Sequence, residues 1–464
     1  MDKKNNNPAP ENKDKNDLNN LKKLTHNSVL KKNIVINLLC KVLPIFVAVF
    51  AIPYIINGLG VEKFGILSII WMIISQAGIL DLGLGHALTQ LISKKLGLNE
   101  TEEIPAIAWT GLLVILVLGV AGSSVIFMVA EFITNNILRV SEAFAQETTL
   151  AFKILCVCLP AFILIAAMEG ILASYQKFTR INLITVPLAL LNYLSPVIVL
   201  QFTTNLAYVI LTLVVIRFGA LIAMFINCRL LIGQISGKIQ FKKRILKPLV
   251  SFGSWLTLTN IMNPLLNLLE RFVMTFMLTA SVIAYFNTPY DVLKRLGVIT
   301  FSFLQVMFPA FSFESASNKK RTQFLYIRVS LSILALIIIP VFVVFFFADQ
   351  LISFWISEEF AQKSYRIAQV LALFMMINCL NPVPVEVIQS VGRSDITAKI
   401  KISQLIYYVP LFIYLVSGMG LLGAAIAMLI KICIEFMINT FIAFRILIVP
   451  DDVKVKQGLG ANPG

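Results

Sequence analysis

Residues 64–93 read FGILSIIWMIISQAGILDLGLGHALTQLIS, and this stretch decides the fold class. Residues 64–80 are almost wholly apolar, and Asp81, Gly83 and Gly85 follow at once. An apolar run of this length is typical of a helix that crosses the ~30 Å hydrocarbon core of a bilayer. The stretch therefore indicates a transmembrane helix that ends in a small polar joint, where glycines let a neighbouring helix approach or let the backbone bend.

The whole chain has the composition of an integral membrane protein. Its 464 residues are 58% hydrophobic and 14% charged, and the mean hydropathy is +0.85. One water-soluble core could not hide that much apolar surface. We therefore expect an all-α membrane protein with twelve transmembrane helices. The expected spans are 34–56, 64–91, 106–130, 150–174, 181–203, 206–230, 248–277, 283–312, 324–347, 365–390, 400–417 and 421–447.

Basic residues concentrate in the segments on one side of the predicted spans, and the other side has few. Because Lys and Arg in short loops favour the cytoplasmic side, this pattern places both termini in the cytoplasm. The basic connections include Lys94–Lys95, residues 238–247, residues 319–328 and residues 393–401. This topology and anionic lipid headgroups account for most of the formal net charge of +15, so we expect membrane lipids and no nucleic acid as partners.

Motifs of enzymes and metal sites are missing from the sequence. The six cysteines and two histidines show no metal-ligand spacing, and no Walker loop, serine elbow or zinc-protease motif occurs. We predict no catalytic residue, no metal and no cofactor. No soluble stretch is long enough for an ATPase domain, so transport would be driven by a gradient or by the substrate itself.

Short matches recur between the two halves of the sequence at a nearly constant offset. The clearest pairs Glu169 with Glu386, each followed by a basic residue about two turns later. A six-helix repeat enters twice from the same side, so its copies are related by a pseudo-two-fold axis along the membrane normal. The predicted domains are a disordered tail 1–33, a six-helix bundle 34–230, a basic linker 231–247, a second six-helix bundle 248–447 and a tail 448–464.

Ionisable residues inside the predicted spans are the candidate functional residues, since charge is costly in a bilayer. The cations Lys41, Arg217, Lys294, Arg295 and Lys431 fall near the midplane together with Asp291 and Glu435, and the pair Glu270–Arg271 falls towards the outer end. Two self-pairs at i,i+4 spacing are expected, Asp291 with Arg295 and Lys431 with Glu435. Snorkelling, or pairs that only join helices, is the alternative.

Three motifs resemble one family of membrane transporters. In residues 58–95, Gly60, Phe64 and Gly65 precede the sequence DLGLG (81–85) and then ALT (87–89). This order resembles the oligosaccharide flippases of the Wzx kind, in the multidrug/oligosaccharidyl-lipid/polysaccharide exporter superfamily. The departure is His86, where the family more often has Arg. The further matches are residues 169–178 and Glu270–Arg271 with Tyr285 and Pro289, although Glu270 stands where the family has Asp.

The resemblance implies a MATE-like fold and a flippase of the bacterial inner membrane. The substrate would be an undecaprenyl-pyrophosphate-linked oligosaccharide for O-antigen, lipopolysaccharide or a similar surface polysaccharide, moved by alternating access. A proton or sodium ion would drive the cycle, and a polysaccharide polymerase is a further expected partner. The site residues would then be Lys41, Arg217, Arg271, Lys294 and Arg295 for substrate binding, Glu270, Asp291 and Glu435 for ion coupling or for orienting the cations, and Asp81, Gly83, Gly85, Glu169 and Glu386 at the gate.

Two other functions stay open from the sequence. A cation-coupled multidrug exporter of the same superfamily would need acidic residues to attract cationic drugs, and the cationic midplane argues against it. A scaffold for polysaccharide polymerase assembly would leave the charges inside the spans without a purpose.

Overall fold

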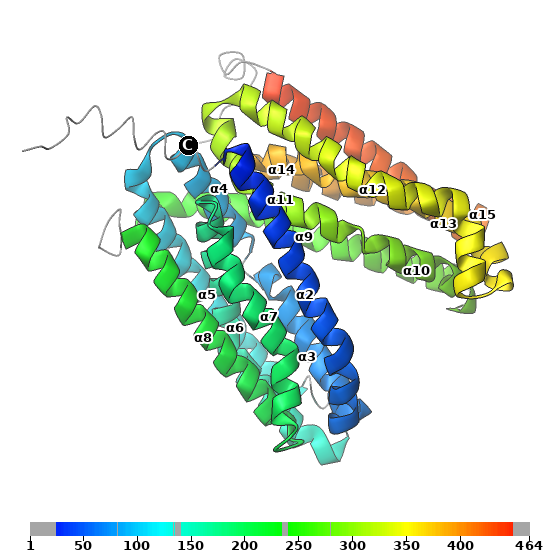
Figure 1. The fold of residues 1–464 in the computed structure, drawn as a ribbon, viewed down its shortest axis with the longest axis horizontal. Coiled ribbons are helices and arrows are strands. Elements are labelled where there is room, and N and C mark those ends of the chain that lie inside the picture. Colours follow the sequence, from blue (N-terminus) through cyan, green and yellow to red (C-terminus); the bar gives the residue numbers. More distant parts are fainter. Residues whose placement is uncertain are drawn as a thin grey trace, which may run out of the picture. The chain divides into compact units, whose positions relative to one another are not determined.

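The computed structural model describes residues 25–80, 82–132, 134, 141–233, 240–278 and 280–448, and the regular structure in these ranges is helical (Figure 1). Nine helical stretches of the described chain are long and apolar enough to cross a membrane. One of them, α15 (Ser394–Ile448), spans 55 residues and has a non-helical residue, Gly420, between its two arms. The predicted all-α membrane fold is confirmed, and α15 contains both of the last two predicted spans.

The chain divides into two compact units, Met1–Ser254 and Trp255–Gly464. The division falls inside α9 (Lys243–Met277) and not in the predicted linker 231–247. The beginning of α9 is held in the first unit, where Arg244 donates to Glu103 at 2.7 Å. The two-bundle domain boundaries stay a prediction.

The first unit is built around one long helix, α6. This helix packs against α3, α4, α5 and α8, while α2 packs against α7 (Figure 1). The helices are α2 (Asn27–Leu59), α3 (Val61–Leu80), α4 (Leu84–Gly97), η2 (Thr101–Glu103), α5 (Ile104–Phe132), α6 (Glu142–Ser174), α7 (Phe178–Val199) and α8 (Leu206–Gly233). Helix α2 begins at Asn27, inside the segment 1–33 that was predicted to be a disordered tail.

The second predicted span, 64–91, is wrong as a continuous helix, because it breaks between α3 and α4. Leu82 and Gly83 take positive φ values of 51° and 68°, which stops the helix. Asp81 lies outside the described residues. Just past the break, Gly85 lies against α6: a Cβ on Gly170 would stand 2.8 Å from the Gly85 carbonyl oxygen. The two glycines of the motif therefore serve both expected purposes, a bend at Gly83 and a close helix contact at Gly85.

The second unit contains two further broken spans. The predicted span 283–312 divides at the turn Arg295–Leu296, and the span 365–390 divides at Asn381. Pro382 is the first residue of the new helix at the second break, where its missing N–H costs no helical hydrogen bond. The helices are α10 (Ala280–Lys294), α11 (Gly297–Ser317), α12 (Lys319–Trp355), α13 (Glu358–Leu380), α14 (Pro382–Ser390) and α15.

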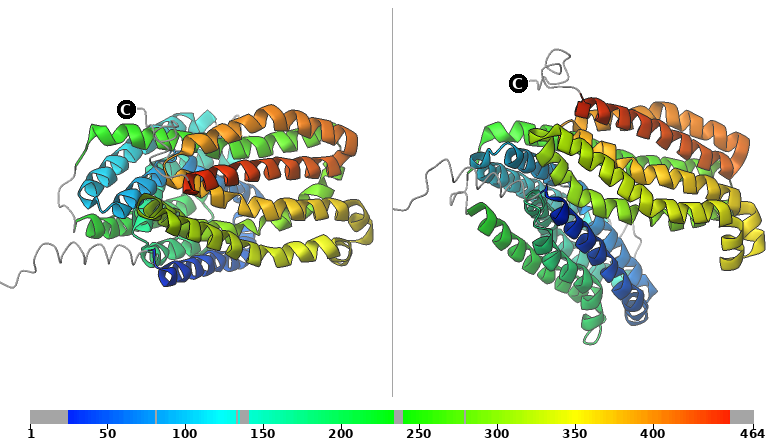
Figure 2. Two further views of the ribbon diagram at one scale, coloured as in Figure 1. Left: turned by 90° about the horizontal axis from the view of Figure 1, so that it is seen from above. Right: turned by 45° about the horizontal axis from the view of Figure 1, so that its top comes forward.

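Helix α13 holds the second unit together. It packs against α10, α12, α14 and α15, and α14 also packs against α15. Figure 2 shows α12, α13 and α15 running side by side. Buried polar contacts described below join α9 to both arms of α15, and join the break before α14 to α15.

The close contact at Gly170 gives a stability prediction. Gly170→Ala would place a methyl group 2.5 Å from Thr89 Oγ1 and 2.8 Å from the Gly85 oxygen, so we expect a loss of about 1–3 kcal/mol. Gly219→Ala is the matched control, because nothing lies within 4 Å of its Cβ position. Thermal unfolding of the purified protein in detergent measures both. Equal melting temperatures for the two variants would contradict the predicted contact.

Candidate functional site

A cluster of opposite charges lies inside the first unit. Glu169 on α6 interacts electrostatically with Arg217 on α8 and with Lys41 on α2. The Arg217 guanidinium also lies over the Phe162 ring, 4.1 Å from its centroid. Three predicted site residues from three helices are thus brought together. Because Glu169 is the residue before Gly170, the cluster lies directly beside the packed break between α3 and α4.

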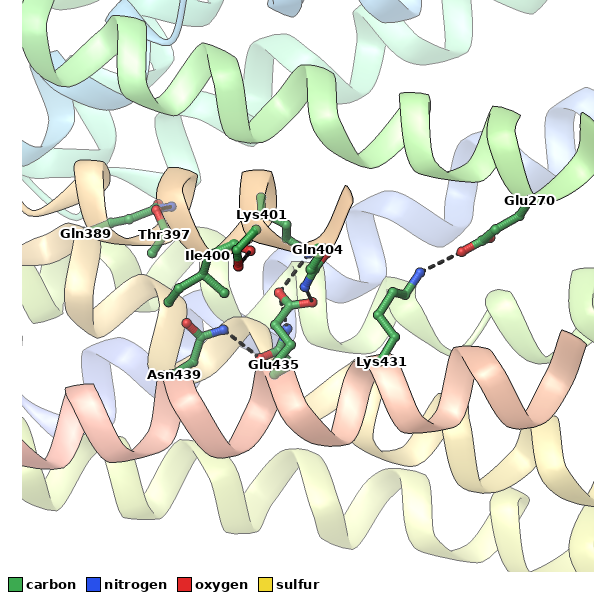
Figure 3. A network of polar contacts seen from close by, with 11 residues as sticks. Glu270, Gln389, Thr397, Ile400, Lys401, Gln404, Lys431, Glu435 and Asn439 are labelled. Atoms are coloured by element: carbon green, nitrogen blue, oxygen red, sulfur yellow. Dashed lines mark hydrogen bonds and ion pairs between the residues drawn. The ribbon is translucent and has the colours of Figure 1, made fainter. Parts of the chain in front are cut away.

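The second unit holds a buried ion pair with a tyrosine at its side. Lys431 Nζ on α15 lies 2.6 Å from Glu270 Oε1 on α9 (Figure 3). The Tyr408 hydroxyl donates to the same carboxylate oxygen at 2.6 Å, and Lys431 lies 4.3 Å from the centre of the Tyr408 ring. Glu270 is only 5% exposed, so its charge depends on these two partners.

A second buried carboxylate, Glu435, lies one turn further along α15. Lys401 is 2.7 Å from Glu435 Oε1, and Gln404 donates to Oε2 at 2.7 Å. Asn381, at the break between α13 and α14, donates to Oε1 at 2.9 Å and accepts from Asn439 at 3.0 Å. Both carboxylate oxygens of Glu435 therefore have partners (Figure 3). Through these bonds Glu435 links Asn381, at the helix break, to both arms of α15.

Both predicted self-pairs are wrong. Lys431 points to Glu270 on another helix, and Glu435 is paired with Lys401. Asp291 and Arg295 are exposed and form no ion pair with each other in the described chain. The reason is physical: an i,i+4 pair on one helix is worth a few tenths of a kcal/mol, whereas a buried carboxylate needs several strong partners, which neighbouring helices supply.

A small pocket of about 30 Å³ opens beside the Glu270–Lys431 pair. Its volume is enough for at least one water molecule. Arg271, Lys294 and Glu270 bring charge to its wall, and the other lining residues are Asn267, Met274, Phe286, Asn287, Tyr290 and Met428. Three predicted site residues thus meet here, two for substrate binding and one for ion coupling.

The remaining predicted residues lie elsewhere. Arg295 and Asp291 are exposed and do not line the pocket. Glu386 lies on α14, and its Oε2 atom is buried without a hydrogen-bond partner in the described chain. Gly83 lies in the break between α3 and α4, and Gly85 lies at the helix contact just past it.

Sequence reasoning missed Lys401, Gln404 and Tyr408, which bind the two buried carboxylates. Lys401 was counted with the cytoplasmic loop 393–401, yet its side chain is only 15% exposed. The signal was present, since these residues are spaced i, i+3 and i+7 and share one helical face. The other arm of α15 also has a polar stripe on one face, formed by Lys431, Glu435 and Asn439 at i, i+4 and i+8.

The pocket combines groups suited to an anion. Two cations, two carboxamides and two aromatic rings are part of its lining, and Arg binds phosphate oxygens through paired N–H donors. Glu270 adds a negative charge that an entering anion would meet. The lining residues can form ion pairs and hydrogen bonds with a ligand, and none of them is a nucleophile held by a base.

Comparison with known proteins places the chain in a family. Residues 59–365 match the model of a family described as polysaccharide biosynthesis protein. The chain belongs to this family. A protein of Shigella flexneri named as an O-antigen transporter is 27% identical over 416 residues, which cover 89% of this chain and 97% of the relative. The lipopolysaccharide biosynthesis protein WzxC of Escherichia coli (strain K12) is 25% identical over 409 residues, 84% of this chain and 75% of that protein.

Solved structures support the fold of this family member. An outward-facing multidrug resistance MATE family transporter of the MOP superfamily superposes with a TM-score of 0.74. The match covers 93% of this chain and 99% of the transporter at 17% identity, so it shows the fold alone. The predicted resemblance to the Wzx-type flippases and the MATE-like fold are confirmed.

The Glu435 network gives a second stability prediction. Lys401→Met would leave the Glu435 carboxylate, which is 1% exposed, without its cation, and we expect a loss of about 3–5 kcal/mol. Lys399→Met is the matched control, because the Lys399 side chain is 64% exposed and its pair with Asp395 lies at the surface. Thermal unfolding in detergent measures both. If Lys401→Met unfolds like the control, the buried pair is wrong; the double variant Lys401→Met/Glu435→Leu should recover most of the loss.

Proposed function

We propose that this protein is a flippase that moves a polyprenyl-pyrophosphate-linked oligosaccharide across the bacterial inner membrane for surface polysaccharide synthesis. The pocket lined by Arg271 and Lys294 carries the proposal, because it offers two cations and two carboxamides inside a membrane protein. The named functions of the two relatives support a lipid-linked sugar as substrate. The polyprenyl tail would stay in the lipid during transfer.

The diphosphate is the part of this substrate that needs protein charge most. Leaving water strips it of hydration, and cations in a low-dielectric site replace that hydration best. Arg271 and Lys294 would hold it in the second unit. The cluster of Lys41 and Arg217 around Glu169 is a second candidate place for an anion, in the first unit.

Glu270 is proposed to couple transport to an ion gradient. Its carboxylate lines the pocket and is bonded to Lys431 and Tyr408. A bound diphosphate and the Glu270 carboxylate would compete for Lys431, so occupation of the pocket and the state of this ion pair would depend on each other. An inward ion gradient would drive outward transfer by exchange, with the ion moving inwards as the substrate moves outwards. Alternating access would expose the pocket to the two faces of the membrane in turn.

A cation-coupled multidrug exporter is less well supported by this pocket. Such a pump needs unpaired carboxylates facing its substrate, and the carboxylate here is already bonded to Lys431. Loss of resistance to cationic drugs in a deletion strain, with normal surface polysaccharide, would establish the exporter instead.

Arg271→Ala tests the proposal in a strain that lacks this gene. We expect the wild-type gene to restore surface polysaccharide, and Arg271→Ala to reduce it at least about tenfold while the lipid-linked precursor accumulates, because a charge-assisted bond to phosphate is worth roughly 1.5–3 kcal/mol. Labelling of surface glycan and extraction of precursor measure both.

Arg295→Ala is the matched control. Arg295 is an exposed arginine of the same unit, in the turn between α10 and α11, and it does not line the pocket, so its loss should leave export near wild type. Equal loss in both variants would contradict the pocket and favour a general effect of positive charge. Membrane levels of both proteins must match, as shown by immunoblotting.

A further inference from the structure

Helix α9 presents a row of three carboxamides that the pocket only partly explains. Asn260, Asn263 and Asn267 are all exposed, and only Asn267 lines the pocket. None of the three side chains makes a hydrogen bond with another residue of the described chain. We call these three residues the amide row.

The amide row occupies its own side of the helix. At 3.6 residues per turn, its three members and Arg271 fall within a sector of about 80°. Exposed apolar side chains occupy a different sector, with Ile261 at 41%, Leu268 at 65% and Phe272 at 66% exposure. Helix α9 therefore has one exposed face suited to lipid and another that is polar.

An exposed amide without a partner is unfavourable in hydrocarbon. Polar side chains in membrane helices face a protein interior or a water-filled space for this reason. Helix α9 is not among the nine described stretches that are apolar enough to cross a membrane, as expected of a helix with a polar face. The amides of the row are exposed, so water or a polar ligand meets this face of α9.

The chemistry of the row fits a sugar. A carboxamide offers two donors and an acceptor, which match hydroxyl and acetamido groups, and it carries no charge to attract a phosphate. The row extends about 16 Å from Asn260 to Arg271 at 1.5 Å per residue. It is continuous with the pocket through Asn267, so a ligand anchored by its diphosphate at Arg271 would lay its first sugars along the row.

We propose that Asn260, Asn263 and Asn267 form a glycan-binding surface that orients the oligosaccharide, with its diphosphate end at Arg271. This inference rests on the proposed flippase function and assigns the sugar part of the substrate to named residues. The row would recognise hydrogen-bonding groups rather than charge, so it would accept neutral as well as acidic sugars.

Two ligands separate the glycan surface from the diphosphate pocket. The full-length protein is purified in lipid nanodiscs and titrated calorimetrically with inorganic pyrophosphate and, separately, with the reducing oligosaccharide released by mild acid from the precursor that accumulates in the deletion strain. The variant is Asn260→Leu/Asn263→Leu, which leaves every pocket residue unchanged. The matched control is Asn227→Leu, since the Asn227 amide bonds to its own helix in the first unit.

We expect the double variant to bind the oligosaccharide about 25-fold more weakly, roughly fivefold for each lost amide, with pyrophosphate affinity unchanged. Unchanged pyrophosphate binding also shows that the variant is folded. Oligosaccharide affinity equal to wild type would overturn the glycan surface, and so would an equal loss for both ligands, which would place the row in the diphosphate site. Failure of the proposed function is a different result: the deletion strain would then accumulate no lipid-linked precursor.

Discussion

A charge inside a hydrocarbon layer is stable only when another polar group meets it, and this constraint shapes both units of the protein. The cost of an unpaired buried ion is several kcal/mol, more than most single packing contacts contribute. Glu270 is accordingly bonded to Lys431 and Tyr408, and Glu435 to Lys401, Gln404 and Asn381. In each case the partners come from different helices or from opposite arms of α15, so the charges fix the helix pairing of the second unit.

The same constraint explains where function is placed. A carboxylate with all its partners, such as Glu435, is a structural joint, and here it holds the break between α13 and α14. Glu270 differs because it has two partners and also faces a pocket with Arg271 and Lys294. Its bonds can be exchanged for others when a ligand or a proton arrives. The amide row extends this logic to uncharged groups, since three exposed and unbonded amides on α9 require a polar neighbour.

The sequence predicted the all-α membrane fold and the part that two glycines play at one helix break. Apolar length alone identifies a spanning helix, and Gly83 and Gly85 were expected at a bend or a close contact, which is where the structure has them. The charged residues Glu270, Arg271 and Lys294 were chosen on cost in a bilayer, and they meet at one pocket.

Partners across helices could not be predicted in the same way. The spans are apolar nearly all round, so the inward face of each helix is not readable, and only same-helix pairs could be proposed. Lys431 illustrates the error with a partner on α9, and Glu435 with a partner on the other arm of α15. The predicted spans 283–312 and 365–390 ran through the breaks at Arg295 and Asn381, although the charges in residues 291–295 lie beside the first break and Pro382 beside the second. The polar spacing in α15, from Lys401 to Tyr408, was a usable signal that a search for polar stripes within apolar helices would find.

Direct translocation in a purified system tests the central claim. The protein is reconstituted into liposomes with the lipid-linked oligosaccharide in both leaflets, and a glycosidase added outside reports how much glycan reaches the outer leaflet. The account predicts that wild-type vesicles expose nearly all of the substrate with time, while vesicles carrying Arg271→Ala/Lys294→Ala expose only the half that starts outside. Exposure by the variant at the wild-type rate would contradict a cationic pocket that carries the diphosphate.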